Sequence, residues 1–170
     1  RILSSAASDV YKRQDGDIEK KKSGSEYFGL GSVSVSHNDD LMAYSLDLKG
    51  SEYFTIYLRD LTNNNNLTDQ IENTSGSITW SLDSKSFFYS KLDKFHRPRK
   101  IYKHILGKPV ENDELIFEEK DETFTCSIDL SSDEKYFIIS TSDHITTEEH
   151  FFESISSDIK PKLFKKRKKD

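Results

Sequence analysis

The chain has 170 residues, a length that suits one ordinary domain, and it carries a formal net charge of −5 with a pI near 5.6. An acidic chain has no general attraction for phosphate backbones or anionic lipid, so nucleic acid is not an expected partner. No apolar run approaches the roughly 18–20 residues that span a bilayer, so no membrane contact is expected either.

Aromatic residues make up 12% of the chain although its apolar fraction is only 34%. That aromatic content is more than a disordered chain normally carries, so we expect a folded, polar-surfaced, β-rich protein. Cys126 is the only cysteine. The chain can therefore form neither an internal disulfide nor a Cys-rich zinc site, which fits a reducing compartment.

The first segment of the chain differs from the rest in its sequence. Residues 4–14 read SSAASDVYKRQ, which looks like the in-frame translation of a common sequencing adapter. We therefore interpret residues 1–14 as an assembly artefact and leave them out of the fold prediction. The alternative is a genuine polar N-terminal helix. If an adapter does interrupt the reading frame, the chain begins inside a gene.

Three segments of the remaining chain align without gaps. They read SHNDDLMAYS at 36–45, SLDSKSFFYS at 81–90 and SSDEKYFIIS at 131–140, so they recur after 45 and then 50 residues. This spacing is typical of β-propeller blades, each a sheet of four strands. In each segment a polar turn with Asn38, Asp83 or Asp133 separates a short strand from a longer one.

The repeat predicts an all-β fold with about three four-stranded blades, at approximately 31–75, 76–123 and 124–170. The predicted strands are 32–36, 41–47, 53–60 and 67–71, then 77–81, 86–91, 100–106 and 114–118, then 124–129, 136–141, 147–153 and 162–165. The run 63–66 is predicted as a tight polar turn. Alternating apolar residues such as Ile56, Leu58 and Ile101 are what a half-buried sheet needs. Three blades do not close a ring, so the prediction is of part of a propeller.

The stretches 27–61, 96–107 and 117–124 carry a family likeness. In order and spacing they resemble the propeller of the prolyl oligopeptidase family of serine peptidases, above all its oligopeptidase B branch. The resemblance covers residues 15–170. His37 departs from it, because the family's turn usually has a proline there. The resemblance implies a partial N-terminal propeller domain at 15–170, from a seven-bladed propeller that caps an α/β-hydrolase domain.

The hydrolase domain of such an enzyme would carry a nucleophilic Ser on a G-x-S-x-G turn, followed by Asp and His. No G-x-S-x-G occurs in this chain. Ser36, Ser81 and Ser131 are predicted turn residues rather than nucleophiles. We therefore assign no catalytic residue here and expect the chain alone to be inactive.

Metal and cofactor sites are not predicted either. The histidines show no H-E-x-x-H pattern or close pairing, so structural roles are expected for them. They are His37, His96, His104, His144 and His150. The run from Gly29 to Gly31 lacks the third glycine of a dinucleotide-binding loop, and no Walker A pattern is present.

Two charged clusters each allow two interpretations. The acidic residues Glu118, Glu119, Asp121, Glu122, Glu148 and Glu149 could face a substrate cavity, but an ordinary solvated loop is favoured. The basic run 165–169 resembles a targeting or nucleic-acid tail. Its position favours the outer strand of the third blade, where charge protects a sheet edge from unwanted pairing.

The expected function is that of a gate. The chain would be the substrate-restricting propeller segment of a serine-type oligopeptidase that cleaves short peptides, as the resemblance implies, after Lys or Arg. Its expected partners are those peptides and the hydrolase domain of the same protein, and its expected location is the cytoplasm, with the periplasm left open. The alternative is a non-catalytic propeller that binds another molecule through its loops.

Overall fold

The computed structural model describes residues 20 and 24–168, so the expectation for residues 1–14 lies outside the described residues. The described part is built from antiparallel β-strands and one short 3-10 turn, η1 Val110–Asn112. The strands are β1 Gly29–Val35, β2 Leu41–Asp47, β3 Phe54–Asp60, β4 Asn65–Trp80, β5 Ser86–Leu92, β6 Pro98–Ile105, β7 Glu114–Glu118, β8 Thr125–Leu130, β9 Tyr136–Ser142, β10 Thr147–Glu153 and β11 Lys162–Lys165.

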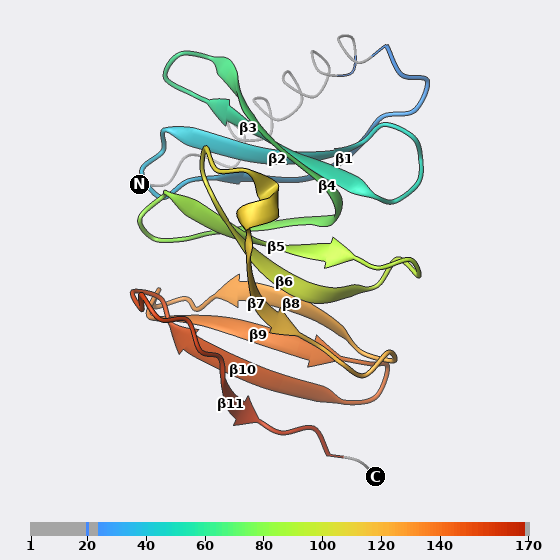
Figure 1. The fold of residues 1–170 in the computed structure, drawn as a ribbon, viewed down its shortest axis with the longest axis vertical. Coiled ribbons are helices and arrows are strands. Elements are labelled where there is room, and N and C mark those ends of the chain that lie inside the picture. Colours follow the sequence, from blue (N-terminus) through green and yellow to red (C-terminus); the bar gives the residue numbers. More distant parts are fainter. Residues whose placement is uncertain (1–19, 21–23, 169–170) are drawn as a thin grey trace.

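The strands are arranged as successive blades. Pairing runs in chain order from β1 to β7 in one sheet, and β8 to β11 form a second sheet with the order β11-β10-β9-β8. We call β1 to β3 with residues 65–74 of β4 the first blade, the rest of β4 with β5 to β7 the second, and β8 to β11 the third. Figure 1 shows these layers following one another down the long axis. The all-β propeller prediction is confirmed.

One predicted break in the chain is wrong. The strands expected at 67–71 and 77–81 are both parts of β4, which runs for 16 residues from the first blade into the second. Thr74 pairs with Phe54 on one side and with Lys91 on the other, and the register shifts just after it. Gly76 has φ 87°, and an added Cβ would lie 3.0 Å from Phe54 and Ser45. A glycine therefore lets the strand bend between blades without ending.

The repeated turns explain why the sequence repeat was visible. In each, a serine hydroxyl donates to the side-chain oxygen two residues later at 2.6–2.7 Å, and the backbone amide five residues later donates to the serine oxygen. The residue third after the serine is left-handed, with φ of 56–62°. The serine and acceptor pairs are Ser36 and Asn38, Ser81 and Asp83, and Ser131 and Asp133. The predicted turn roles are confirmed.

A second repeat was not recognised in the sequence. The loops that join the second and third strands of each blade all begin with an aspartate whose carboxylate accepts backbone N–H groups of the loop. Asp47 accepts from Lys49, Gly50 and Glu52; Asp93 accepts from Phe95 and Arg97; Asp143 accepts from Ile145 and Thr146. A single aspartate after an apolar strand is a weak sequence signal, so only the structure shows that it is periodic.

The polar turn expected at 63–66 is displaced. The turn occupies residues 61–64, with Asn64 at φ 57°, while Asn65 and Asn66 already belong to β4. Asp60 accepts from the amides of Thr62 and Asn63, which moves the turn toward β3. The asparagine run therefore predicts the hairpin between β3 and β4 correctly, but the turn lies two residues earlier than predicted.

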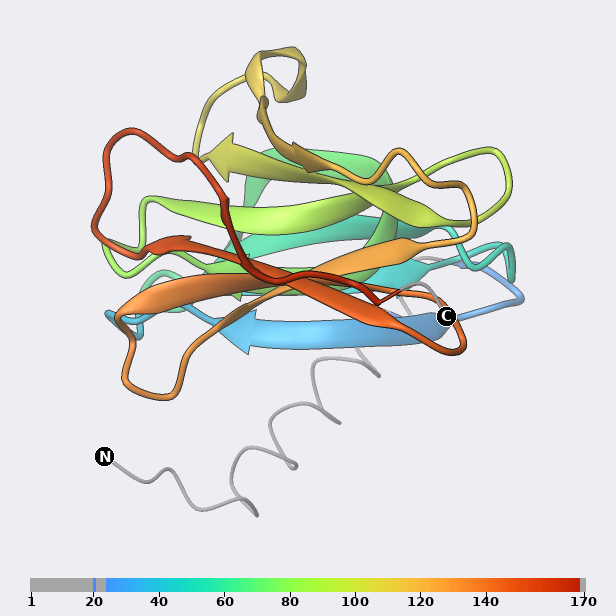
Figure 2. The same cartoon turned by 90° about the horizontal axis from the view of Figure 1, so that it is seen from below.

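The core lies between the blades. One cluster joins the first and second blades around Trp80 and Phe87, and another joins the second and third around Phe88 and Phe137. Ile101, one of the predicted core residues, has no exposed surface. Figure 2 shows the loop that carries η1 standing out from this layered body of strands.

Candidate functional site

The first strand of each blade is its innermost strand and has a strand of the same blade on one side only. β1 and β8 are the terminal strands of their sheets, and residues 76–80 of β4 pair only with β5. In a propeller such innermost strands surround the central channel. A groove with a volume of about 170 Å³ lies between the inner strands of the second and third blades. The groove therefore lies beside the strands that would border the channel of a complete propeller.

The lining of the groove is uncharged and rich in hydroxyls. It is formed by Ser75, Ser77, Thr79, Phe88, Tyr89, Ser90, Pro98, Thr125, Cys126, Ser127, Ile128, Ser140 and Ser142. Thr79 Oγ1 donates to the carbonyl of Ile128 at 2.8 Å, which fixes the two inner strands to each other. No imidazole, ammonium or carboxylate belongs to this lining, so it can contact a ligand but offers no general base.

Cys126 is the only thiol at the groove and it is buried. Burial raises the pKa of this thiol to about 12, with a smaller contribution from Glu119. A thiol that stays protonated at neutral pH is not a nucleophile. Cys126 therefore serves as a small apolar residue of the core between the second and third blades.

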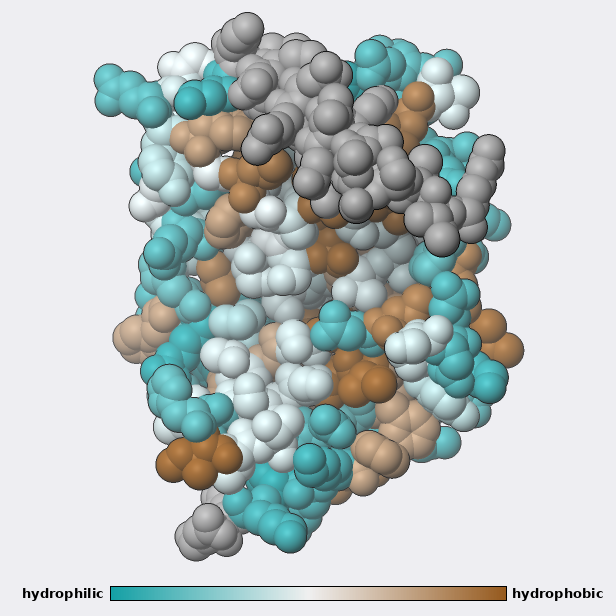
Figure 3. All heavy atoms as spheres, turned by 180° about the vertical axis from the view of Figure 1, so that it is seen from behind, coloured by the Kyte–Doolittle hydropathy of each residue, from teal (hydrophilic) through white to brown (hydrophobic). Residues whose placement is uncertain are grey.

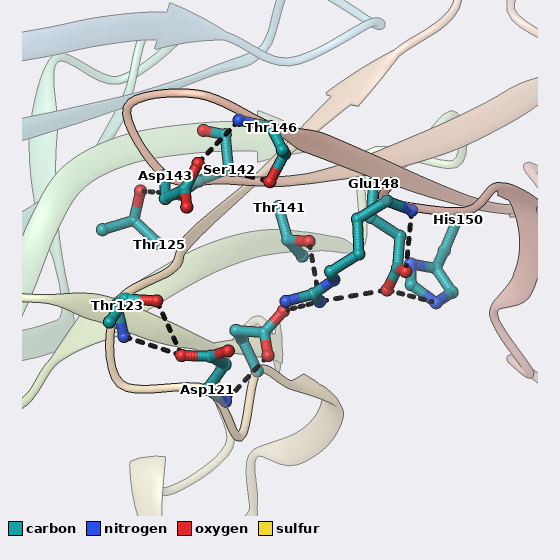
Figure 4. Close-up of polar contacts among 11 residues, drawn as sticks. Asp121, Thr123, Thr125, Thr141, Ser142, Asp143, Thr146, Glu148 and His150 are labelled. Carbon is teal, nitrogen blue, oxygen red and sulfur yellow. Dashed lines mark hydrogen bonds and ion pairs between the residues drawn. The ribbon is translucent and has the colours of Figure 1, made fainter. Parts of the chain in front are cut away.

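An ion pair in which Glu119 is buried and Arg167 and Glu148 are partly exposed lies at the outer part of the same junction. One terminal nitrogen of Arg167 lies 2.5 Å from Glu119 Oε2 and 3.0 Å from Glu148 Oε1, and its guanidinium stacks 3.9 Å from the centroid of the Phe124 ring. Figure 4 shows Thr141 and Glu148 turned toward this centre. The carboxylate of the second blade and that of the third thus share one guanidinium.

The charges of this centre stabilise one another. The hydrogen bond from Arg167 lowers the pKa of Glu148 despite the opposing effect of burial, and the carboxylates raise the pKa of Arg167 further. His150 lies 3.8 Å from Glu148, but burial lowers the pKa of this imidazole. The guanidinium, rather than the histidine, supplies the positive charge.

Beside the ion pair lies a charged hollow of about 730 Å³. It is lined by Glu119, Lys120, Asp121, Glu148, Lys166 and Arg167. Both signs of charge occur in this lining, and its two best-buried carboxylates are already occupied by Arg167. The hollow therefore presents a mixed, largely self-neutralised surface rather than a free acidic pocket.

A second buried polar centre lies between the first and second blades. His104 of β6 has no exposed surface, and its two ring nitrogens lie 3.0 Å from Asp69 and 2.7 Å from Asp113. Tyr89 donates its hydroxyl hydrogen to Asp113 at 2.8 Å. Burial, followed by the hydrogen bond to Asp113, raises the pKa of Tyr89, so this phenol stays protonated.

The residues singled out in the sequence are not brought together. The hydrogen-bonded structural role expected for His104 is confirmed, whereas His37, His96 and His144 are exposed. Among residues 20 and 24–168, no group of three or more His, Cys, Asp or Glu side chains has the geometry to hold a metal ion. Within the described part of the chain, His37, His96 and His144 lie at the surface and His104 lies in the core between the first two blades.

The acidic cluster is only partly the solvated loop that was favoured. Glu118 and Glu122 are exposed, but Glu119 is 5% exposed and bound to Arg167. A carboxylate buried next to a guanidinium is stabilised by that charge instead of by water. The expectation for the basic run 165–169 holds only for Lys165, which lies in β11 and pairs with β10. Residues 166–168 lie beyond the strand, and Arg167 contributes to the ion pair instead.

Figure 3 shows brown hydrophobic residues on one face separated by pale and teal ones. The most exposed large hydrophobic residues are Ile155, Ile145 and Phe164, at 85%, 84% and 72%. No helix in the described part of the chain is long and apolar enough to cross a membrane.

Comparison with known proteins points to one family. Residues 17–170 match the family described as the N-terminal β-propeller domain of prolyl oligopeptidase. The chain is 32% identical over 142 residues to Protease 2 of Moraxella lacunata, which covers 82% of the chain and 21% of that protein. It is 30% identical over 133 residues to dipeptidyl aminopeptidase BI of Pseudoxanthomonas mexicana, covering 78% and 18%. The chain thus spans about a fifth of the length of these relatives.

Solved structures give the same fold. Oligopeptidase B from Leishmania major superimposes with a TM-score of 0.84 over 90% of this chain and 22% of its own, and at 24% identity this likeness concerns the fold alone. Oligopeptidase B from Trypanosoma brucei, solved with covalently bound antipain, gives a TM-score of 0.80 at 27% identity, over 89% of this chain and 21% of its own.

Proposed function

Because the chain belongs to the prolyl oligopeptidase family, as part of its N-terminal β-propeller domain, we propose that it is an access-restricting segment of a serine-type oligopeptidase. The single observation that carries the proposal is the family match across residues 17–170. In the proposed whole protein, this propeller caps a catalytic α/β-hydrolase domain that supplies the nucleophile, the acid and the base. The chain itself supplies none of these groups.

The proposed mechanism is selection by size. A propeller over an active site admits short or flexible peptides and excludes folded proteins. The uncharged groove at the inner strands supports this role, because it offers contact surface without a reactive group. The two buried ionic centres fit the same role, since a barrier must hold its blades together while substrates pass.

The finer parts of the proposal have separate supports. The likeness to oligopeptidase B favours cleavage after Lys or Arg, and the acidic groups that would select those residues would lie outside this chain. The division into an artefact at 1–14 and a partial propeller at 15–170 follows from the sequence. Blade limits near 31–75, 76–123 and 124–170 follow from the repeat. A cytoplasmic location is proposed from the single reduced cysteine.

The complete protein should cleave a short peptide with one Lys or Arg and leave the same sequence intact inside a stably folded host protein. The first control replaces that Lys or Arg by Gln, and loss of cleavage supports basic specificity. The second control unfolds the host, and cleavage then shows that folding was the obstacle. Preference for proline would overturn the basic specificity alone, whereas equal rates on the peptide and the folded host would overturn the gate.

A further inference from the structure

His104 joins the first two blades through a buried centre of ionisable groups. Its Nε2 faces Asp69 of β4, and its Nδ1 faces Asp113 in the segment before β7. The side chains of His104, Asp69 and Asp113 are 0%, 5% and 3% exposed. The amide of Gly107 also donates to Asp69 at 2.6 Å. Strands of two blades therefore meet at one imidazole.

The two contacts together require an additional proton. A neutral imidazole has one N–H, so it can donate to one carboxylate only, and its other nitrogen would direct a lone pair at the second carboxylate. An imidazolium donates to both. Asp69 from β4 and Asp113 from the segment before β7 face the ring directly, and Tyr89 from β5 acts through Asp113.

The surroundings of the ring favour the imidazolium. Burial alone lowers the pKa of His104, but the hydrogen bonds to Asp113 and Asp69 outweigh burial and raise that pKa above its ordinary value. Phe87 packs against the ring with centroids 5.3 Å apart, and Trp80 lies 5.5 Å from Phe87. The centre is thus continuous with the apolar core between the first and second blades.

We propose that Asp69, His104 and Asp113 form a proton-dependent staple, which holds β4 of the first blade against β6 of the second while the imidazole carries both protons, and which loosens this junction when one proton leaves at alkaline pH. The inference is independent of any peptidase activity. A group whose pKa is raised on folding stabilises fully below its unfolded value, about 6.5 for histidine, and loses that effect as pH rises through its folded value. Above about pH 6.5 the staple therefore weakens as pH rises, and it is weakest in alkali.

Amide hydrogen exchange in the complete protein, followed by mass spectrometry from pH 6 to pH 10 and corrected for intrinsic exchange, tests the staple. In the wild type, protection of the peptide containing Gly107 should fall as pH rises from about 6.5, the unfolded pKa of histidine, to the folded pKa of His104. The fall should reach at most about tenfold per pH unit, the limit for one linked proton, and should level off above the folded pKa. His104→Gln should lower this protection at neutral pH and remove its pH dependence. His150→Gln is the matched control and should keep the wild-type dependence.

Equal pH dependence in the wild type and in His104→Gln would overturn the proposal. If His104→Gln does not fold, the titration of His104 in the wild type tests the proposal instead. Exchange of the His104 C2 hydrogen, followed by mass spectrometry, reports the midpoint of the ring's titration. A midpoint above 6.5 supports the staple, and a midpoint at or below 6.5 contradicts it.

Discussion

The two blade junctions of this chain are held by different chemistry. The first is crossed by one continuous strand, β4, and contains the buried His104 centre. At the second, β7 ends at Glu118 and β8 begins at Thr125, and the junction relies on the Phe88 cluster and the Arg167 ion pair. The repeat contributes apolar residues such as Phe87, Phe88 and Phe137 to the junctions, whereas the ionic contacts of His104 and Arg167 come from residues outside it. Under the proposed staple, the first junction loses the positive charge of His104 as pH rises, whereas the guanidinium of Arg167 keeps its charge at the second.

One contact is common to both junctions. Ser45 and Ser90 end the aligned segments of the first two blades, and each donates to a carbonyl of the next blade's inner strand. The distances are 2.9 Å to Gly76 and 3.5 Å to Cys126. The repeat therefore encodes a weak polar contact that both junctions share, and its apolar residues Phe87 and Phe88 contribute to the two cores separately.

Core truncation should break the comparison most strongly, because Phe87 and Phe88 are neighbours that point to opposite junctions. Phe88→Ala should cost about 3–5 kcal/mol, the usual range for a fully buried phenylalanine, and should loosen the second junction. Phe87→Ala is the matched variant and should loosen the first. Local hydrogen exchange in β8 and β9, compared with β2 and β3, measures this. Equal effects of both variants on both junctions would contradict the account.

The ion pair should contribute less than the core but act on one junction only. Glu119→Gln removes one of two carboxylates from Arg167, so a loss of about 2 kcal/mol is expected from hydrogen bonds to charged groups. Exchange should rise around β7 and β10 while β4 is unchanged. Glu118→Gln is the control: it removes only an exposed ion pair with Lys100, so at most about 0.5 kcal/mol should be lost. An equal rise in β4 would show that the junctions are not separate.

The serine contacts should give the smallest effects and a fixed order. Ser45→Ala removes a bond to Gly76 and one from the amide of Ser32, so about 1 kcal/mol should be lost. Ser90→Ala removes a longer bond and should cost less than about 0.5 kcal/mol. Chemical denaturation of the complete protein, with local exchange as the second readout, compares them. A larger loss for Ser90→Ala would reverse the interpretation of these distances.

Most of the fold could be predicted from the sequence because the turns repeat. Ser36, Ser81 and Ser131 each start a turn in which side-chain and backbone bonds reinforce each other, so the pattern is local and readable. The continuity of β4 was missed because a polar run with Gly76 usually marks a break. A bend that preserves pairing has no distinct sequence signal.

The buried ionic centres could not be predicted to the same degree. Glu119 and Arg167 are 48 residues apart, and Asp69 and His104 are 35 apart, so no short motif connects them. In sequence, Glu119 is one of several adjacent acidic residues, and the others on its loop are mostly exposed. The role expected for His104 was correct in kind, but its two partners follow only from how adjacent blades pack.

This chain is proposed to be a non-catalytic propeller segment of a peptidase, and one assay tests that proposal most directly. The 170-residue chain and the complete protein are compared on the same arginyl reporter peptide, with and without a reagent that labels active-site serines. Only the complete protein should hydrolyse the reporter and take up one label per molecule, and the isolated chain should match the buffer. Turnover by the isolated chain that the reagent abolishes, at one label per chain, would contradict the account.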